Sequence, residues 1–344
     1  MDNLQWQVSA IDNNDKQLWQ DWQTLFESSH AHNPMLDTRF VQSLFSHFPA
    51  SVYNATGTLN GKVAAILLLE KSKLGRWKNY LPSQSQLALM LALPNIDFNI
   101  HGLMASLGGN TIKLDIFGLD PQEHSSIINS INQPQTYAKN IKLQINGLFD
   151  DYWRERPKRL RKDISKNLNR LAKDEVEVVY KQVSDVDEIK LAVDRYGLLE
   201  SQGWKGKNGT AIHPANIQGQ FYLSLLEIFA QNQQAQVFES YIDKQLAASR
   251  LCIFNDDTLI ILKTTFDEKY SRYALGNLNR FKLIENLFEK KTSKCVDFYT
   301  NASKEQLYWS TEQRPMFNAS CYRFDLIEQG ISLIKHAKHK LKNR

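Results

Sequence analysis

The segment from Glu200 to Ile212, ESQGWKGKNGTAI, combines residue types that could bind a ligand. Gly203 follows an apolar periodic run and is expected to end a helix in a left-handed conformation. Trp204 then offers a flat apolar wall, Lys205 a point charge, and the glycines after them a backbone that can approach a ligand closely. This combination favours a pocket for an anionic or acyl-bearing ligand. The simpler alternative is a capped helix with a half-buried tryptophan.

The same segment resembles a known signature. The pattern Glu200-x-x-x-Trp204-Lys205-Gly206, followed by Gly209-Thr210-Ala211, is similar to that of GNAT-related acetyltransferases of the CelD type. Members of this family accompany bacterial polysaccharide genes and are relatives of the FemAB peptidyltransferases. The resemblance extends over residues 154–324 and is only architectural over the first 150 residues. It implies GNAT-like domains, acetyl-CoA as the acyl donor, and an acceptor site that includes Glu200, Trp204 and Lys205.

In a GNAT-like fold the donor lies where the strand Thr258 to Phe266 leads into the helix Asn277 to Lys291. Backbone N–H groups at a helix start, with the helix dipole behind them, form a site for a pyrophosphate. Gly276 would allow close approach of the backbone, Asn277 would cap the helix, and Arg272 would add charge. These are the predicted cofactor-binding residues. The alternative is an ordinary loop glycine before a helix.

Acyl transfer to an amine needs an acceptor for the amine's proton, stabilisation of the oxyanion, and a proton for the leaving thiolate. Asp267 stands at the end of the strand that leads toward the donor, Tyr273 lies in the next loop, and Asp297 ends the neighbouring strand. We expect these side chains to converge as the catalytic group. The alternatives are turn or cap roles for both aspartates and a packing role for Tyr273.

The chain departs from the family pattern at two places. Ordinary GNAT enzymes have a shorter loop with a second small residue, whereas this loop keeps the single Gly276, and the Pro of CelD-type relatives is Leu275 here. The family's Tyr-Lys pair after the second aspartate falls at Glu305-Gln306, although Trp309 is retained. An altered donor, an altered acceptor or weakened catalysis are therefore alternatives.

Hydrophobic periodicity predicts two halves of similar order. Expected in the first half are a strand at Leu4–Ser9, helices at Lys16–Ser28 and Thr38–Phe48, strands at Val52–Leu59 and Lys62–Glu70 around Asn60-Gly61, a strand at Lys113–Phe117 and a helix from Pro121. Expected in the second are a strand at Val176–Tyr180, helices at Val186–Ser201 and Pro214–Gln231, strands at Gln236–Ile242, Gln245–Phe254 and Thr258–Phe266, a helix at Asn277–Lys291, a strand at Cys295–Tyr299, a helix at Lys304–Ser310 and a strand at Ser320–Asp325. This is the order of a GNAT domain and not of a doubly wound Rossmann sheet. We expect an α/β (α+β) fold of tandem GNAT-like domains with mixed, largely antiparallel sheets.

The 344 residues exceed what one growing core usually holds, so two domains are expected. They are a degenerate GNAT-like domain over residues 1–150 and an acetyltransferase domain over residues 151–330, followed by a basic tail at 331–344. No 18-residue apolar run or basic, apolar leader occurs, which favours a cytoplasmic protein with peripheral attachment at the inner membrane as an option. Cys252, Cys295 and Cys321 lack metal-site spacing, and no metal is expected.

The net charge of +5 is concentrated in two places. Residues 154–173 carry nine Arg and Lys against two acids, and residues 331–344 carry five Lys and Arg against none, so the remainder is acidic. One helical face would present a cationic stripe of Arg156, Arg159, Lys162, Lys166, Arg170 and Lys173. It favours a phosphate-bearing acceptor, an acyl carrier protein or an anionic membrane surface, and not DNA. Binding of tRNA has weaker support because no aromatic residues interleave with the charges, and a solvated face is the alternative.

We therefore expect an acyl-CoA-dependent N-acyltransferase that acetylates an amino group on a sugar or nucleotide sugar of a bacterial envelope polysaccharide. Two alternatives stay open. One is aminoacyl transfer from charged tRNA to a peptidoglycan precursor, as the FemAB relationship implies. The other is a catalytically inactive GNAT pair that binds an anionic partner as a scaffold.

Overall fold

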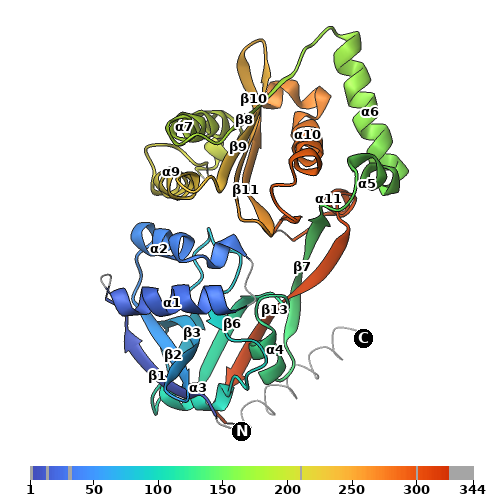
Figure 1. Cartoon of the computed structure of the whole chain (residues 1–344). Helices are drawn as coiled ribbons and strands as arrows, with labels where there is room; N and C mark the ends of the chain where they lie inside the picture. Colours follow the sequence, from blue (N-terminus) through green and yellow to red (C-terminus); the bar gives the residue numbers. More distant parts are fainter. Residues whose placement is uncertain (1–2, 13–14, 30–32, 210, 300, 325–344) are drawn as a thin grey trace, which may run out of the picture.

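The computed structural model describes residues 3–12, 15–29, 33–209, 211–299 and 301–324 (Figure 1). The first half contains β1 (Gln5–Ala10), α1 (Lys16–Ser28), η1 (Pro34–Leu36), α2 (Thr38–His47), β2 (Val52–Leu59), β3 (Lys62–Lys71), β4 (Arg76–Asn79), β5 (Met90–Ala92), α3 (Ile100–Ser106), β6 (Lys113–Leu119), α4 (Ser125–Ser130) and β7 (Gln135–Gln144). The second contains α5 (Phe149–Glu155), α6 (Lys158–Lys173), β8 (Val179–Val183), α7 (Val186–Gln202), α8 (Trp204–Lys207), α9 (Ile217–Ala230), β9 (Ala235–Ile242), β10 (Gln245–Phe254), β11 (Thr258–Phe266), η2 (Glu268–Tyr273), α10 (Leu275–Lys290), β12 (Cys295–Asp297), α11 (Lys304–Leu307) and β13 (Glu312–Tyr322). The basic tail lies outside the described residues.

The strands form one 13-stranded mixed sheet that runs through both halves. Its order is β1-β2-β3-β4-β6-β13-β7-β12-β11-β10-β9-β8, with β5 paired to β3. The last strand, β13, lies between β6 and β7 and is antiparallel to both. β7 also pairs with β12, so β7 and β13 form the long ribbon that joins the lower and upper parts of Figure 1. The two halves therefore share backbone hydrogen bonds as well as side-chain contacts.

The meander strands confirm the local predictions. At the β2–β3 turn, Asn60 and Gly61 have φ of 53° and 75°. Asp243 and Lys244 have φ of 50° and 65° at the β9–β10 turn. Two consecutive residues with positive φ give the turn whose twist matches antiparallel strands. β2, β10 and β11 have the bounds that the alternation of apolar residues predicts.

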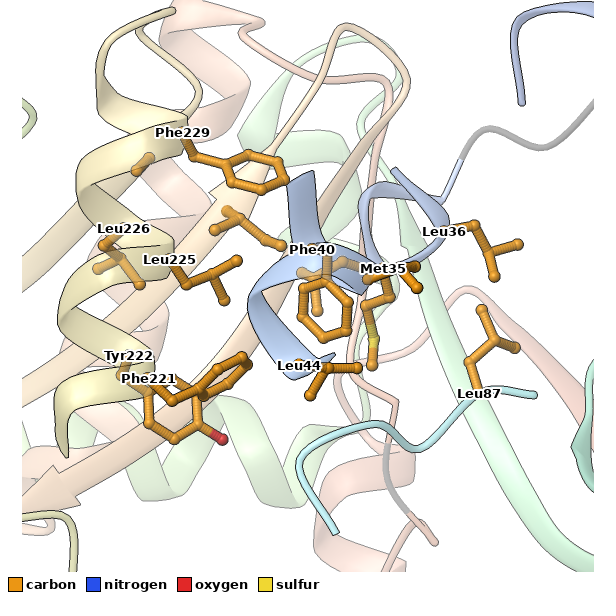
Figure 2. Close-up of a cluster of buried hydrophobic side chains, with 14 of the residues drawn as sticks. Met35, Leu36, Phe40, Leu44, Leu87, Phe221, Tyr222, Leu225, Leu226 and Phe229 are labelled. Atoms are coloured by element: carbon orange, nitrogen blue, oxygen red, sulfur yellow. The ribbon is translucent and has the colours of Figure 1, made fainter. Parts of the chain in front are cut away.

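One apolar core crosses the junction of the halves (Figure 2). The Phe40 ring of α2 meets the Phe221 ring of α9 edge to face, with centroids 6.1 Å apart. Arg39 places its guanidinium 4.2 Å above the Phe229 ring and also bonds to Gln234. A fully buried phenylalanine stabilises a fold by roughly 1.5–3 kcal/mol. The packing of α2 against α9 thus fixes the orientation of the two halves.

Separate cores cover the opposite face of the sheet. In the second half, α5, α6 and α10 pack over β9–β12 around Leu283, Phe281 and Trp309. In the first half, α3 packs over the other face around Phe98 and Leu103. Each half is therefore a helix–sheet–helix sandwich, which is the GNAT-like arrangement expected from the order of elements. No helix in the described ranges is both long and apolar enough to cross a membrane.

Several elements differ from the predictions. β4, β5, α3 and β7 were not predicted, because they are short or rich in polar residues. The last strand was expected from Ser320, but β13 begins at Glu312. The first residues of β13 are polar and include Pro315, so the local pattern does not predict a strand there. Its partners in β6 lie about 200 residues earlier in the chain. The helix expected from Pro121 begins at Ser125, and the strand expected from Val176 begins at Val179.

Candidate active site

Two neighbouring parallel strands separate in the middle of the second half. β11 pairs with β12 only from Thr258 to Ile260. Beyond that point β11 stays with β10 as far as Phe266, whereas the chain after β12 stays with β7, where the Phe298 N–H bonds to the Ile141 carbonyl at 3.2 Å. We call the space between residues 261–266 and residues 298–299 the second wedge. It is the point at which backbone groups of a sheet become available to a ligand.

The start of α10 borders the second wedge. Ala274 is its N-cap in a left-handed conformation, and its carbonyl accepts the N–H groups of Asn277 at 2.8 Å and Leu278 at 3.2 Å. The helix thus begins two residues before the predicted start, and the prediction that Asn277 is the cap is wrong. A Cβ on Gly276 would lie 3.4 Å from the Phe266 ring, which is an ordinary contact. Packing inside the protein therefore does not require a glycine at this position.

Two arginines near α10, the buried Arg250 and the half-buried Arg280, lack an acidic partner. Arg250 of β10 is 1% exposed and donates from Nη2 to the Gly276 carbonyl at 2.6 Å and from Nη1 to Asn279. Arg280 lies over the rings of Phe298 and Trp309, at 5.8 and 5.4 Å from their centroids. Burial lowers the pKa of Arg250 to about 9 and that of Arg280 to about 10. Among the described residues, neither side chain pairs with a carboxylate, and both Nε atoms are enclosed without an acceptor.

The sequence analysis did not single out either arginine. Arg250 is the single charged residue of an apolar segment, AASRLCIF, whereas Arg280 is followed by Lys282 and Glu285 in FKLIENLF and has no such signal. A lone cation in an apolar segment is the signal that could have identified Arg250, because unpaired buried charge is costly and is found at functional sites. The pair forms a positive region on the α10 side of the second wedge.

Two predicted site residues fasten η2 to the end of α6. Arg272 forms an ion pair with Asp174 at 2.5 Å, and the Tyr273 hydroxyl donates to the same carboxylate oxygen at 3.0 Å. Arg170 of α6 donates to the Arg272 carbonyl. Arg272 therefore stays at the loop surface near the start of α10, whereas the Tyr273 hydroxyl is already engaged.

The two predicted catalytic aspartates do not converge, and that expectation is wrong. Asp297 lies beside the strand register of Ile260, whereas Asp267 is seven residues further along β11. Seven extended residues span about 23 Å. Asp267 caps η2, accepting the Lys269 N–H at 3.0 Å, and forms an ion pair with the same lysine. Asp267 thus takes the cap role that was the alternative.

Asp297 belongs to a buried network at the junction of the halves. Its Oδ2 accepts from Arg314 at 2.5 Å, and its Oδ1 accepts from Asn140 at 2.8 Å. Arg314 also bonds to Asp120 at 2.6 Å, and the Tyr299 hydroxyl donates to Asp120 at 2.8 Å. Burial raises the pKa of Asp297 against the opposing effect of Arg314. Burial opposes ionisation of Asp120 as well, but Arg314 holds its pKa below the usual value. This geometry supports a structural role for Asp297.

Glu200 is a buried anchor for the segment after α7. It is 2% exposed, and its Oε1 accepts from Tyr196 at 2.9 Å and from Lys205 at 2.5 Å. Its Oε2 accepts the Ile212 N–H at 2.7 Å. Glu200 therefore holds both ends of the loop between α7 and α9. Lys205 is brought to this anchor, while the Trp204 side chain lies outside the described residues.

The glycines of this loop serve the protein's own packing. Gly203 has φ of −86° and an extended conformation, so the expected left-handed helix end is wrong. A Cβ on Gly206 would lie 1.8 Å from the Ser201 carbonyl oxygen. The close backbone approach predicted for this loop therefore occurs at Gly206 between two parts of the chain. Only Gly209 of these three has a positive φ, of 68°.

Lys263 is a half-buried amine on the wedge stretch of β11. It pairs across β10 with Leu251, which belongs to the core under α7 and α9, and its Nζ lies 5.5 Å from the centroid of the Tyr222 ring. Burial lowers the pKa of Lys263, Glu200 opposes this shift and Lys205 adds to it. Among the described residues, its amine makes the Tyr222 ring contact and no hydrogen bond or ion pair. The single lysine in the strand TLIILKTTF was the missed sequence signal.

The first half covers this side of the second wedge. η1 contacts β11, and Asn33 just before η1 donates to the Tyr299 hydroxyl at 2.5 Å. Trp22 of α1 fixes η1 through a 2.8 Å bond to the Leu36 carbonyl. An acceptor that reaches Lys263 therefore lies between the two halves. Among the described residues, no group of three His, Cys, Asp or Glu side chains is placed to hold a metal.

Known proteins share the fold of this chain. A family model described as an acetyltransferase (GNAT) domain matches residues 158–306. The C-terminal domain of a putative lysylphosphatidylglycerol synthetase from Agrobacterium fabrum is 11% identical, with a TM-score of 0.58, covering 92% of this chain and 96% of that one. FemX is 8% identical with a TM-score of 0.57, covering 94% of this chain and 99% of FemX. No curated protein matches.

These likenesses establish the fold of the chain. Residues 158–306 match a GNAT domain, and solved structures share the arrangement of both halves. L-PGS from Bacillus licheniformis also shares it, at 10% identity and a TM-score of 0.53, covering 90% of this chain and 92% of that one. The fold is therefore GNAT-like over nearly the whole chain.

Proposed function

We propose that this chain is an acyl-CoA-dependent N-acyltransferase whose reaction takes place in the second wedge. The observation that carries the proposal is the separation of β11 from β12 with basic groups on both faces of the gap. Arg250 and Arg280 lie on the α10 face and Lys263 on the opposite face. The match of residues 158–306 to a GNAT acetyltransferase domain supports an acyl-transfer chemistry at this place.

The α10 face suits an anionic donor. The buried Arg250 and the half-buried Arg280, which have no carboxylate partner among the described residues, leave positive charge that a phosphate-bearing ligand would neutralise. The helix start adds backbone N–H groups of the same polarity. The exposed Arg272 lies on the loop that precedes this helix start. We assign acetyl-CoA to this face, with its pyrophosphate near residues 275–276. Aminoacyl-tRNA is the alternative donor, because its terminal phosphodiester carries the same kind of charge.

The Lys263 face suits an amine acceptor. Burial lowers the pKa of Lys263, which favours its neutral amine, and we propose that this amine accepts the proton that the acceptor nitrogen loses. The acceptor nitrogen forms the new C–N bond, the C–S bond of the thioester breaks, and the proton passes through Lys263 to the leaving thiolate. Lys205 and Glu200 border this face, where we place an amino sugar or nucleotide sugar of an envelope polysaccharide. The CelD-type assignment belongs to this proposal.

The outward face of α6 supports an anionic partner. Arg156, which was expected in its cationic stripe, instead lies before α6 and is buried against the Tyr152 and Ser310 carbonyls. A shallow hollow of about 570 Å³ follows this face and is lined by Lys158, Arg161, Lys162, Ser165, Lys166 and Asn169. The buried stripe of Leu160, Ile164 and Leu171 holds the opposite side of the helix against the body. We propose that this face receives the acceptor's phosphates, an acyl carrier protein or an anionic membrane surface at the cytoplasmic side. Any of these contacts should weaken with salt, because exposed charges are screened over about 8 Å at physiological ionic strength.

The test is transfer and binding with labelled acetyl-CoA in three proteins. Lys263→Met should keep acetyl-CoA affinity and lower the rate of transfer to glucosamine-type amines by about 10²- to 10⁴-fold. Arg280→Met should instead weaken acetyl-CoA binding. Lys190→Met, an exposed lysine of α7, is the matched control and should change neither.

Three results would redirect the assignment. Transfer from aminoacyl-tRNA with no response to acetyl-CoA would favour the tRNA-dependent alternative. Binding of neither donor would favour the alternative of a catalytically inactive GNAT pair that acts as a scaffold. Full activity of Lys263→Met at every pH would show that water or another group takes the proton.

A further inference from the structure

The first half contains a wedge at the same position in its own fold. β6 runs beside β4, and the Ala88 N–H still bonds to the Gly118 carbonyl at 2.8 Å. Beyond that point β5 stays with β3, whereas the chain after β6 turns into α4. We call the space between residues 88–92 and residues 119–127 the first wedge.

His124 fills the inner end of the first wedge. Its Nδ1 accepts the Asp120 N–H at 2.9 Å, so its Nε2–H donates to the Ala88 carbonyl at 3.1 Å. The ring is 3% exposed, and burial lowers its pKa to about 4, which keeps it neutral at physiological pH. A side chain of the protein thus joins the two separating strands. The inner end is closed to a pantetheine-like chain.

A hollow of about 240 Å³ remains outside His124. Met90 and Ile127 give it an apolar side, and Ser29, Asn95 and Ser126 give it polar groups. Glu123 also lines the hollow, and its Oε2 is enclosed with no hydrogen-bond partner among the described residues. A buried carboxyl oxygen without a donor costs free energy unless a ligand or water supplies one.

The charges around Glu123 are unbalanced. Burial is the largest effect that raises its pKa, to about 8, and Asp120 and Asp297 raise it further. Arg314 and Lys142 oppose them, and the neutral His124 ring adds no charge. With all three carboxyls ionised, the neighbourhood would carry more negative than positive charge. Glu123 therefore keeps its proton at neutral pH until a cation arrives.

We propose that the first wedge is a binding site for a small primary amine, with its ammonium on Glu123 and its carbon chain against Met90 and Ile127. An ammonium brings three donors, which suits the Glu123 carboxyl and the oxygens of the serine and asparagine side chains that line the hollow. A metal ion is less suited, since only one carboxylate reaches the hollow and metal ions of the Ca²⁺ or Zn²⁺ type need several ligands. The proposal is independent of the reaction in the second wedge.

Binding of the amine should release a proton from Glu123 below pH 8. The affinity should rise about tenfold per pH unit up to pH 8 and then level off, until the amine loses its own proton near pH 10.4. Near pH 7, calorimetry in two buffers of different ionisation enthalpy should therefore report close to one proton released per amine bound. Above pH 9 it should report almost none.

The direct test uses n-butylammonium as the probe and n-butanol as its neutral counterpart of the same shape. Methyl-labelled Met90 and Ile127 should shift with n-butylammonium, whereas Ile284 in the second half should not. The affinity for n-butanol, measured from the same methyl shifts, should be at least tenfold lower than that for n-butylammonium. Glu123→Gln should abolish the preference for the amine, and Glu289→Gln on the exposed end of α10 should not.

The wild-type pH profile tests the site even if Glu123→Gln fails to fold. Equal binding of n-butanol and n-butylammonium would show an apolar hollow without charge recognition and would overturn the proposal. Absence of any Met90 or Ile127 shift at molar excess of the amine would show a hollow that holds water only. Amine binding with a flat pH profile would remove Glu123 from the site.

Discussion

The two wedges share a place in the fold and differ in charge and filling. The first is closed at its inner end by the neutral His124 ring and lined by the carboxyl of Glu123. The second is bordered by Lys263 on one face and by Arg250 and Arg280 on the other. A repeated architecture thus carries two opposite electrostatic environments. The comparison assigns an anionic donor to the second wedge and a small cation to the first.

A single arginine joins the two wedges. Arg314 of β13 bonds to Asp120 at the end of β6 and to Asp297 at the end of β12. These aspartates follow equivalent strands of the two halves, and each stands at the edge of its own wedge. The insertion of β13 between β6 and β7 places Arg314 there. The shared sheet thereby fixes the spacing of the two sites.

The largest expected effect is the loss of this link. Arg314→Met should lower the free energy of unfolding by about 3–5 kcal/mol, because it leaves two buried carboxyls without their cation. Urea denaturation measures it, with Arg154→Met, 74% exposed, as the matched control that should cost less than about 0.5 kcal/mol. A cost below 1 kcal/mol for Arg314→Met would mean that the network does not hold the halves together.

The next effect tests the closure of the first wedge. His124 has a folded pKa of about 4 against an unfolded value of about 6.5, so it contributes stability that is complete above pH 6.5 and is lost as the pH falls toward 4. The wild type should lose about 3 kcal/mol more than His124→Asn between pH 7 and pH 4. Unfolding curves of the two proteins at matched pH values give this difference. Parallel curves would show that His124 is not held neutral.

A smaller effect, with the opposite dependence of stability on pH, is expected for Glu123. Its raised pKa means that its contribution to stability is complete below the unfolded value of 4.5 and is lost as the pH rises through about 8. The Gln of Glu123→Gln cannot ionise. At pH 8 the free energy of unfolding of this variant should therefore be higher than that of the wild type by about 2 kcal/mol, once partial solvent contact is allowed for. Thermal unfolding at pH 4.5 and 8 measures this gain. A variant less stable than the wild type at pH 8 would contradict the excess of negative charge.

The smallest expected change sharpens the assignment of the second wedge. Gly276→Ala should leave the protein stable or stabilise it by about 0.5–1 kcal/mol, because alanine favours a helix and its Cβ meets Phe266 at an ordinary distance. The same change should weaken acetyl-CoA binding if the pyrophosphate lies over the start of α10. Calorimetric titration and melting of one sample separate the two effects. Unchanged acetyl-CoA affinity would move the donor away from Gly276.

The sequence by itself determined the order of the elements. The hairpin at Asn60-Gly61, the meander of β9, β10 and β11, and the amphipathic helix α6 depend on neighbours in the chain, so local periodicity and turn chemistry are sufficient. The order of these elements also led to the GNAT-like fold. Residues 272–277 were correctly placed at the start of α10, although the cap itself was not.

Only the tertiary structure decided which side chains meet. Asp297 faces Arg314 and Asp120 because β13 returns to pair with strands formed almost 200 residues earlier. Glu200 binds the Ile212 N–H and Gly206 packs against the Ser201 carbonyl, so both residues stabilise the loop itself. Residue types do not encode the burial and the close backbone contact that bring these partners together. Likewise, only the tertiary structure shows that no side chain of opposite charge in the described residues pairs with Lys263, Arg280 or Glu123. A lone ionisable residue in an apolar segment gains meaning only when the fold shows whether a partner of opposite charge reaches it.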